Sequence, residues 1–488
     1  MKNLVFFFVF TFQLMFAHVE TKLTLFTFKD MEEFSNNDKK FLASLMTTLD
    51  EERKKCTNHI TLLSGDFLSP FCLSALDKGS HVIELLSLLK VDLVSLGNHE
   101  FDFGTNELKK RIQESKNLKW IASNIIDLDK KPLSGCEDTF IIEIEGVKIG
   151  FLGLIDHNLV AASDIYFLPV FETARLKCEE LKKKGAEVII ALTHLPLEEN
   201  KKLAKAVSDI HFILGGHDKR SITYYVNEAL IHNLGEDSSF LSRIDLVIKK
   251  EKGLVGEKVS IYPSVRLINV KNAQESPKIV EKIQNHQAKH KLSDNIITLK
   301  NDLDATFDSI RTKETVFGNL VADAIKENLG ADLSIVNSGI FCSNTFYAKD
   351  RVLSKKDLCQ EFLFNNKLVL LELKGSDIMD ILENSVLLHD QKAPRFPLIS
   401  GFSFTFDPKK EPSKRIQKVK INNLPIELEK VYKVATVDYL VLGGDGFGAF
   451  KKSKILTSEK EISLVDTLIE YFKKKDAFPS IEGRIKVL

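Results

Sequence analysis

The sequence predicts an α/β protein with two domains, of which the first is a layered α/β domain and the second a mixture of strands and helices. The chain has 488 residues, more than a single hydrophobic core usually organises. Between residues 23 and 267, short apolar runs rich in β-branched residues alternate with amphipathic helical stretches. A polar, helix-favouring segment at 277–292 then predicts an exposed connecting helix, and we place the domain boundary there.

The N-terminus has the pattern of a signal peptide. Lys2 precedes an apolar run over residues 4–16, and Ala17 and His18 follow it. The run is short for a membrane span, although an uncleaved anchor is the alternative. The C-terminal residues contain no long apolar tail of the kind that signals a glycolipid anchor. We therefore expect residues 1–17 to be removed and the product to be secreted, without a stable membrane anchor.

The composition is typical of a globular protein, with 44% hydrophobic and 28% charged residues. Lysine plus arginine and aspartate plus glutamate both total 68, so no overall basic field exists and no nucleic-acid partner is expected. Six cysteines could pair in an exported chain, but no Cys-x-x-Cys motif indicates a zinc ribbon or a redox centre. The sequence does not indicate an oligomeric state.

In the N-terminal half, five apolar runs each lead to a polar residue of a type that binds metals. Because sites in α/β proteins form at the carboxyl ends of strands, we expect these residues to meet at one sheet edge. Any one of them alone could be a turn residue, a helix cap or a loop histidine, whereas their joint placement favours a site. The runs and residues are 23–28 with Asp30, 60–63 with Asp66, 91–96 with Asn98 and His99, 188–192 with His194, and 210–214 with His217.

These side chains form the ligand inventory of a centre with two divalent cations. Asp66 is the natural bridging carboxylate, and Asn98, His194 and His217 offer one amide oxygen and two imidazoles to one ion. Asp30 would serve the other ion. The inventory predicts one or two divalent metal ions of the zinc, manganese or magnesium class and the hydrolysis of a phosphate ester.

The second half opens with a helix between Thr315, which suits an N-cap, and Gly330, which suits the position after the last turn. Mixed strand and helix patterns follow this helix, without an internal repeat.

Several motifs resemble, in order, those of calcineurin-like metallophosphoesterases of the 5′-nucleotidase family. In the first half they are Ser64-Gly65-Asp66, Gly97-Asn98-His99-Glu100-Phe101-Asp102, Thr193-His194 and Gly215-Gly216-His217-Asp218; in the second half they are 311–323, 337–339, 362–366 and 443–447. The resemblance runs from about residue 23 to the C-terminus. It implies a four-layer αββα sandwich at 22–272, a linker helix at 273–295 and a C-terminal α+β substrate-binding domain at 296–488.

The resemblance also implies roles for individual residues. His99 would protonate the leaving oxygen, and Asp102 would hold its ring. In the second domain the implied roles are a base sandwich between Phe364 and Tyr439, ribose contact by Asp445, a substrate-contacting turn at Asn337 and Gly339, and phosphate binding by Arg311. The alternatives are core packing for the aromatic residues and an exposed surface position for the arginine.

Three residues depart from the family pattern. Near the first strand the family has histidine or tyrosine where this chain has Glu32, and after Gly-Gly-His-Asp it has histidine or glutamine where this chain has Lys219. Lys219 could pair with Glu32 and Asp30 in place of one metal, or point to solvent while Glu32 acts as a ligand. Cys342 stands where the family has a phosphate-binding arginine.

The sequence therefore predicts a metal-dependent phosphomonoesterase that acts on nucleoside 5′-monophosphates in nucleotide catabolism. One alternative is a catalytically weakened or inactive homologue that binds nucleotides. Another is a nucleoside di- or triphosphatase or a cyclic-nucleotide phosphodiesterase, because the same metal site serves all of these reactions.

Overall fold

The computed structural model divides the chain into two compact units, and the main boundary between them lies between Ile279 and Val280, with residues 68–82 grouped with the second unit. The expected signal peptide at 1–17 and the candidate ligands Asp30 and Glu32 lie outside the described residues. The structure describes residues 18–29, 41–160, 162, 164–235, 240–253, 256–364, 366–457, 462–474, 478 and 481–488.

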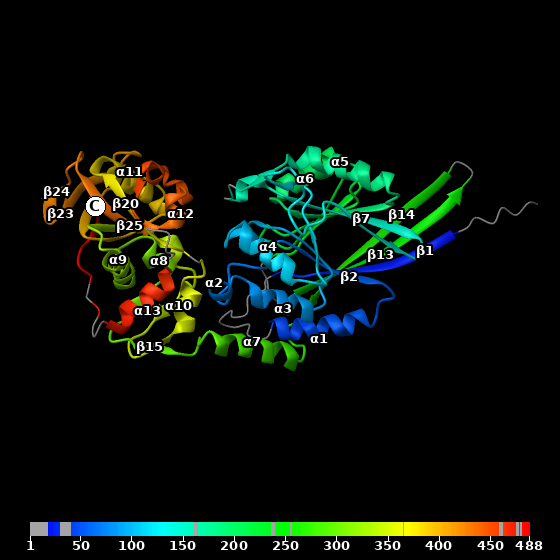
Figure 1. Ribbon diagram of the computed structural model, residues 1–488, viewed down its shortest axis with the longest axis horizontal. Coiled ribbons are helices and arrows are strands. Elements are labelled where there is room, and N and C mark those ends of the chain that lie inside the picture. The colour runs from blue at the N-terminus through cyan, green and yellow to red at the C-terminus, as the bar shows by residue number, and fades with distance from the viewer. Residues whose placement is uncertain are drawn as a thin grey trace, which may run out of the picture. The chain divides into compact units, whose positions relative to one another are not determined.

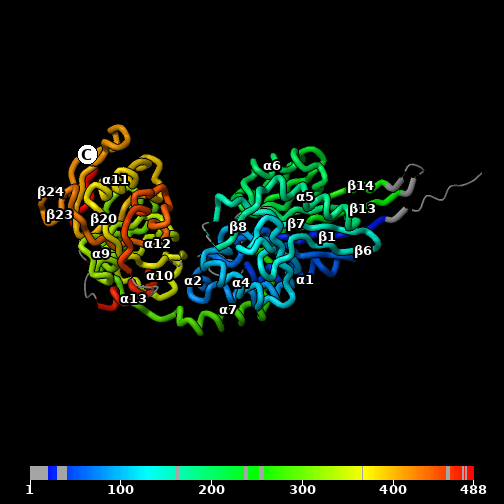
Figure 2. The backbone as a smooth tube through the Cα atoms, turned by 45° about the horizontal axis from the view of Figure 1, so that its top comes forward, coloured from blue at the N-terminus to red at the C-terminus, as the bar shows by residue number. Residues whose placement is uncertain are grey.

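The first unit contains two six-stranded sheets. One has the order β14-β13-β1-β2-β3-β4, in which β1 to β4 are parallel and β13 runs antiparallel to β1. The long strands β13 and β14 pair along their whole length beside β1 (Figures 1 and 2). The strands are β1 (His18–Thr27), β2 (His59–Ser64), β3 (Leu93–Ser95), β4 (Lys119–Ile121), β13 (Phe240–Gly253) and β14 (Gly256–Asn269).

The second sheet of this unit has the order β11-β12-β10-β9-β7-β6, with β7, β9, β10 and β12 parallel. Its strands are β6 (Phe140–Ile144), β7 (Val147–Ile155), β9 (Val188–His194), β10 (Phe212–Gly215), β11 (Ile222–Val226) and β12 (Ala229–Asn233). A separate short pair joins β5 (Ile125–Asp127) to β8 (Ile165–Phe167).

Helices cover the outer faces of both sheets. In Figure 1, α5 and α6 lie on one side of the sandwich and α1 and α3 on the other. Leu62 of the first sheet and Phe151 of the second, both fully buried, belong to the core between the sheets. The four layers confirm the predicted αββα sandwich. The helices of this unit are α1 (Phe41–Arg53), α3 (Ser80–Leu88), α4 (Thr105–Glu114), α5 (Val170–Lys183) and α6 (Leu197–Ala206), whereas the short α2 (Ser74–Asp77) is grouped with the second unit.

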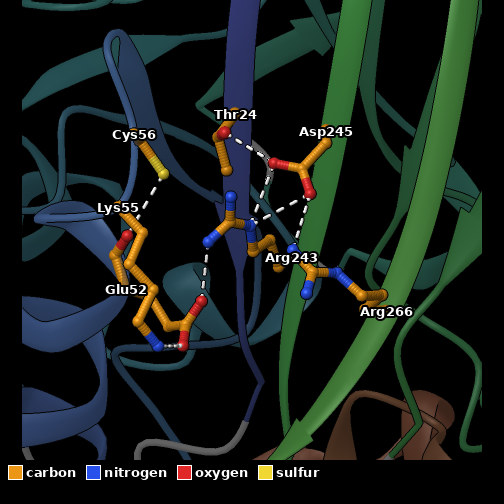
Figure 3. A network of polar contacts seen from close by, with 7 residues as sticks. All are labelled: Thr24, Glu52, Lys55, Cys56, Arg243, Asp245 and Arg266. Atoms are coloured by element: carbon orange, nitrogen blue, oxygen red, sulfur yellow. Dashed lines mark hydrogen bonds and ion pairs between the residues drawn. The ribbon is translucent and has the colours of Figure 1, made fainter.

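A polar network fastens α1 to the first sheet. The Arg243 guanidinium on β13 donates to Glu52 of α1 at 2.7 Å and to Asp245 at 2.9 Å. Thr24 of β1 and Arg266 of β14 also donate to Asp245, so that one carboxylate joins three neighbouring strands (Figure 3). Arg243 is only 8% exposed, and these partners compensate the burial of its charge.

The connecting helix predicted at 277–292 is α7 (Pro277–Lys289), which buries Ile279 and Ile283. The second unit then forms a five-stranded sheet of order β21-β17-β25-β20-β26 and a four-stranded sheet of order β24-β23-β22-β27. The sheet strands are β17 (Leu333–Asn337), β20 (Leu368–Lys374), β21 (Pro397–Ser400), β22 (Phe402–Phe406), β23 (Ile416–Ile421), β24 (Leu424–Pro425), β25 (Val431–Val437), β26 (Lys454–Ile455) and β27 (Ile485–Val487).

Two short strand pairs, β15–β19 and β16–β18, complete the strands of this unit. The remaining elements are β15 (Asn295–Thr298), β16 (Leu303–Asp304), β18 (Phe346–Tyr347), β19 (Val352–Ser354), α8 (Phe307–Ile310), α9 (Val316–Leu329), α10 (Lys355–Glu361), α11 (Gly375–Val386), α12 (Asp438–Val441) and α13 (Leu464–Lys474).

Helix α9 begins and ends at the predicted residues. The Thr315 hydroxyl accepts from the Gly318 N–H at 3.0 Å, and Gly330 adopts the left-handed conformation with φ of 60°. Both predicted caps are confirmed. All six cysteines are free thiols. Within the described part of the chain, no helix is both long enough and apolar enough to cross a bilayer.

Candidate metal centre and substrate pocket

The turn after β2 brings Asp66 close to the turn after β3. Gly65 and Asp66 both have positive φ, 80° and 58°, so the chain bends sharply there. A Cβ atom on Gly65 would lie 2.5 Å from the Gly97 nitrogen, and one on Gly97 would lie 2.4 Å from Asp66 Oδ1. The two glycines are therefore needed because the two turns touch.

Glu100 fixes these two turns from inside the protein. Its carboxylate accepts hydrogen bonds from the backbone N–H groups of Asp66 at 2.8 Å, Phe67 at 2.8 Å and Gly97 at 2.6 Å. The residue is 1% exposed. Three charge-assisted bonds compensate this burial and leave Glu100 oriented toward the backbone, while Asp66 is left for a ligand.

His194, the last residue of β9, is fully buried and has a defined tautomer. Its Nδ1 lies 2.9 Å from the Ser64 carbonyl oxygen, which can only accept, so Nδ1 carries the proton. The other ring nitrogen, Nε2, lies 2.9 Å from Asp66 Oδ2, and it is the atom that a metal ion held by Asp66 would use. Burial alone would raise the pKa of Asp66, but the adjacent imidazole lowers it to about 2.

His217, which follows β10, completes a cluster with His194 and Asp66. Ligand atoms of these three residues lie within 4.8 Å of one another, and His217 Nδ1 is 3.3 Å from His194 Nε2. Burial lowers the pKa of His217, and the charge of His194 lowers it further, which favours the neutral imidazole that a metal requires. The Asn98 Oδ1 atom is buried without a hydrogen-bond partner among the described residues. This donor set fits a divalent cation.

His99 and Asp102 form a pair on the 3₁₀ turn Asn98–Phe101 and its following residue. His99 Nδ1 lies 2.8 Å from Asp102 Oδ2, so Nδ1 donates to the carboxylate and Nε2 is available to another group. Burial lowers the pKa of His99, but the hydrogen bond and charge of Asp102 outweigh it and raise the pKa to about 9. The backbone N–H of His99 also donates to Asp66 Oδ1 at 3.0 Å.

The other predicted metal residues, Asp30 and Glu32, lie outside the described residues, and Lys219 is exposed. The sequence analysis did not single out Lys29, whose Nζ donates to the Asp218 carbonyl oxygen at 3.1 Å. Its charge contributes to lowering the pKa of His217. The motif spacing gave no signal for this lysine.

In the second unit, Asp445 is the centre of a polar cluster. Its carboxylate accepts from Asn337 Nδ2 at 2.7 Å and from the Tyr439 hydroxyl at 3.1 Å. Asp445 has φ of 51°, so the residue is held in a conformation that costs backbone energy. Burial and then the neighbouring carboxylate raise the pKa of Tyr439 to about 12. The structure thus brings together three predicted substrate residues.

The remaining predicted substrate residues surround this cluster less directly. Gly339 approaches Asn337 so closely that a Cβ would lie 2.7 Å from its Nδ2. Phe364 and Tyr439 are 37% and 44% exposed, so neither ring is core packing. Arg311 is close enough for the charge of Asp445 to affect its pKa, which burial lowers.

Two further residues belong to this cluster, and the sequence analysis did not identify them. Asn384 of α11 donates to the Asp445 carbonyl oxygen at 3.2 Å, and Arg395 donates to Asn384 Oδ1 at 3.1 Å. They are separated from Asp445 by 50 residues or more, and no local pattern marks them.

Two family profiles match the chain. The calcineurin-like phosphoesterase profile matches residues 38–221, and the profile of the 5′-nucleotidase C-terminal domain matches residues 295–452. The first contains the Asp66, Asn98, His194 and His217 cluster, and the second contains Asp445 and its partners.

Individual proteins show the same likeness. The trifunctional nucleotide phosphoesterase protein of Bacillus subtilis is 26% identical over 91% of this chain, but the chain spans only 34% of that relative's length. The 5′-nucleotidase of Bos taurus is 26% identical, over 91% of this chain and 85% of that protein. The crystal structure of a 5′-nucleotidase precursor from Thermus thermophilus aligns with a TM-score of 0.72 and 22% identity, covering 96% of this chain and 99% of that one, which shows a common fold.

Proposed function

The chain belongs to the 5′-nucleotidase family of phosphoric monoester hydrolases, and on that premise we propose that it hydrolyses nucleoside 5′-monophosphates to nucleosides and inorganic phosphate. The observation that carries the proposal is the cluster of Asp66, His194 and His217 beside the buried Asn98 amide oxygen. This cluster lies next to an oriented His99–Asp102 pair in the same unit.

Asp66, Asn98, His194 and His217 would hold a divalent ion of the zinc, manganese or magnesium class. Such an ion supplies Lewis-acid polarisation of the phosphoryl group. The chain's own contribution is orientation, because Ser64 fixes the His194 tautomer and Glu100 fixes the Asp66 turn. His99 would donate its Nε2 proton to the leaving oxygen, while its Nδ1 keeps its own proton in the hydrogen bond to Asp102, which stabilises the ring.

We propose that the second unit selects the nucleotide. Phe364 and Tyr439 would stack on the base, and Asp445, Asn337 and the turn at Gly339 would contact the sugar and base. Arg311 would bind the phosphate as a planar fork of donors. Their support is the exposure of both aromatic rings and the hydrogen-bonded Asn337–Asp445–Tyr439 cluster.

The number of metal ions depends on residues near β1 and Asp218. The Lys29 ammonium already lies against the Asp218 carbonyl, beside His217. We propose that one ion binds tightly, at Asp66, Asn98, His194 and His217, and that basic residues replace the second. Elemental analysis after metal loading and desalting would give one ion per chain, and two tightly bound ions would contradict the proposal.

A weakened, nucleotide-binding homologue is the second candidate, and Cys342 is the observation that favours it. Losing one charge-assisted arginine contact lowers substrate affinity by roughly one to two orders of magnitude.

We also propose export of the mature protein, which N-terminal sequencing of the secreted product would test.

The decisive experiment is phosphate release from nucleoside mono-, di- and triphosphates and cyclic nucleotides, measured with Mn²⁺, Zn²⁺, Mg²⁺, Co²⁺ or Ca²⁺. Preference for a 5′-monophosphate supports the proposal, and preference for another class identifies a phosphatase or phosphodiesterase of that class. Binding without turnover under any metal supports the weakened homologue.

The same assay tests His99. We expect His99→Ala to lower kcat by about 10²–10⁴-fold, because the leaving oxygen loses its proton donor. Metal content and melting temperature are the controls and should match those of the parent protein. Turnover close to the parent rate would refute the assigned role.

A further inference from the structure

Arg311 in the second unit lies face-on over an aromatic ring. Its guanidinium carbon is 3.7 Å from the centroid of the Phe307 ring. The two residues are four apart across the single turn of α8, and this spacing places their side chains on one face. A guanidinium stacked in this way has one face covered, so its donors are directed outward along its edge.

The backbone on both sides of this pair is fixed. The Phe307 N–H donates to Asn344 Oδ1 at 2.7 Å, and the Thr306 N–H donates to Asp304 Oδ1 at 2.9 Å. After the pair, His389 Nε2 lies 2.9 Å from the Thr312 carbonyl oxygen. These contacts hold α8 at both ends, so Phe307 is a rigid support.

Arg311 still has unused hydrogen-bonding capacity. Its Nε is buried and has no hydrogen-bond partner among the described residues. The same is true of Asn337 Oδ1 in the neighbouring Asp445 cluster. Asp308, which lies between Phe307 and Arg311 in the sequence, is paired with Lys392 at 2.6 Å. A stacked cation with a buried unsatisfied donor fits an anionic ligand.

Cys342 leaves this place without a second cation. Burial raises the pKa of its thiol to about 12, so the thiol is neutral at physiological pH. The charge of Arg311 nevertheless contributes to lowering that pKa, so the two side chains are near each other. Cys342 therefore adds no positive charge beside Arg311, and the nearby Arg395 is bonded to Asn384.

We propose that Phe307 is a positioning residue that holds Arg311 flat and pre-oriented, so that a single stacked arginine recognises the 5′-phosphate of the nucleotide. This inference rests on the proposed function. Pre-orientation reduces the side-chain entropy lost on binding, and it offsets in part the missing arginine at Cys342.

Calorimetry on the full-length, metal-depleted chain separates phosphate recognition from binding of the base. The probes are adenosine 5′-monophosphate and adenosine, and the variants are Phe307→Leu and Phe307→Tyr. We expect Phe307→Leu to weaken binding of the nucleotide about three- to tenfold. The affinity for adenosine should stay within about twofold of the parent value. Phe307→Tyr keeps the ring and should bind both as the parent does.

Cys342→Arg provides the complementary test, with Cys342→Ser as its control. Cys342→Arg should tighten nucleotide binding about tenfold or more and reduce its dependence on Phe307, while Cys342→Ser leaves both unchanged. The positioning role would be overturned if Phe307→Leu lost equal affinity for the nucleotide and the nucleoside, or if it lost no affinity for either. If the parent binds adenosine but gains nothing from the phosphate, the inference fails while base recognition stands; if it binds neither, the nucleotide pocket itself fails.

Discussion

At the scale of single residues, two neighbouring carboxylates in the first unit have opposite orientations. Asp66 faces the imidazoles of His194 and His217, while Glu100 is turned inward and bonded to three backbone N–H groups. The difference follows from burial, because a carboxylate with 1% exposure needs donors to replace water. Glu100 therefore supports the metal cluster through the backbone of the two turns that carry Asp66 and Asn98.

We expect Glu100→Gln to weaken divalent metal binding by about 10–100-fold and to lower the melting temperature. The amide group replaces one acceptor oxygen with an N–H₂ donor, which then faces backbone N–H groups, and the Asp66 turn loosens. Titration calorimetry with Mn²⁺ measures the affinity. Glu143→Gln, at an exposed position, is the matched control. Parent-like affinity in Glu100→Gln would mean that the glycines alone hold the turn.

At the scale of secondary-structure elements, buried polar side chains connect elements that apolar packing alone would leave free to slide. Arg243 joins β13 to α1 through Glu52 (Figure 3). His232 of β12 joins the two sheets, because its Nε2 lies 2.7 Å from the Ser242 hydroxyl on β13 and its Nδ1 lies 2.9 Å from the Thr223 hydroxyl.

We expect Arg243→Met to lower the free energy of unfolding of the first unit by about 2–3 kcal/mol. A buried charge left without any partner lowers the free energy of unfolding by about 3–5 kcal/mol. The effect is smaller here because Lys55 still pairs with Glu52 in the variant. Urea unfolding followed by circular dichroism measures the change. Arg266→Met, whose side chain is 56% exposed, should cost less than about 1 kcal/mol. Equal effects of the two variants would contradict a structural role for the buried contact.

Because His232, which joins the two sheets, is buried, we expect the stability of the first unit to depend on pH. Burial lowers the pKa of His232 from 6.5 to about 4. Between these values the unfolded chain binds the proton and the folded chain does not, so stability falls as the pH drops from 6.5 toward 4, by on the order of 3 kcal/mol. The melting temperature should therefore fall more steeply with decreasing pH for the parent than for His232→Gln. The same pH dependence in both proteins would show that another group causes the loss of stability in acid.

At the scale of the whole molecule, the metal cluster and the Asp445 cluster belong to different compact units. Each unit has its own sheets, so each can respond to its own ligand. Binding stabilises the unit that contains the site by mass action.

Scanning calorimetry tests this division. At about 100 times its dissociation constant, Mn²⁺ should stabilise the first unit by about 2.7 kcal/mol and raise its transition by roughly 5–10 °C. Under chelator, adenosine 5′-monophosphate should raise the transition of the second unit instead. One transition that responds equally to both ligands would show that the units unfold together.

Features that depend on a local pattern could be predicted from the amino-acid sequence. They are the alternation of strands and helices, the caps Thr315 and Gly330, and the order of the polar residues that follow parallel strands. These could be predicted because propensity, periodicity and capping act over a few residues, and because parallel strands end at a common edge.

The contacts that distant segments make with those residues could not be predicted in this way. The Ser64 carbonyl sets the tautomer of His194 from 130 positions away, Asn344 supports the ring beneath Arg311 from 37 positions away, and Arg243 reaches Glu52 across 191 positions. No local pattern encodes such contacts, since they arise when sheets and turns pack and buried polar groups must find partners. The motifs therefore predicted Asp66, His194 and His217 as one group, and packing sets the orientation and the hydrogen-bond partners of these side chains.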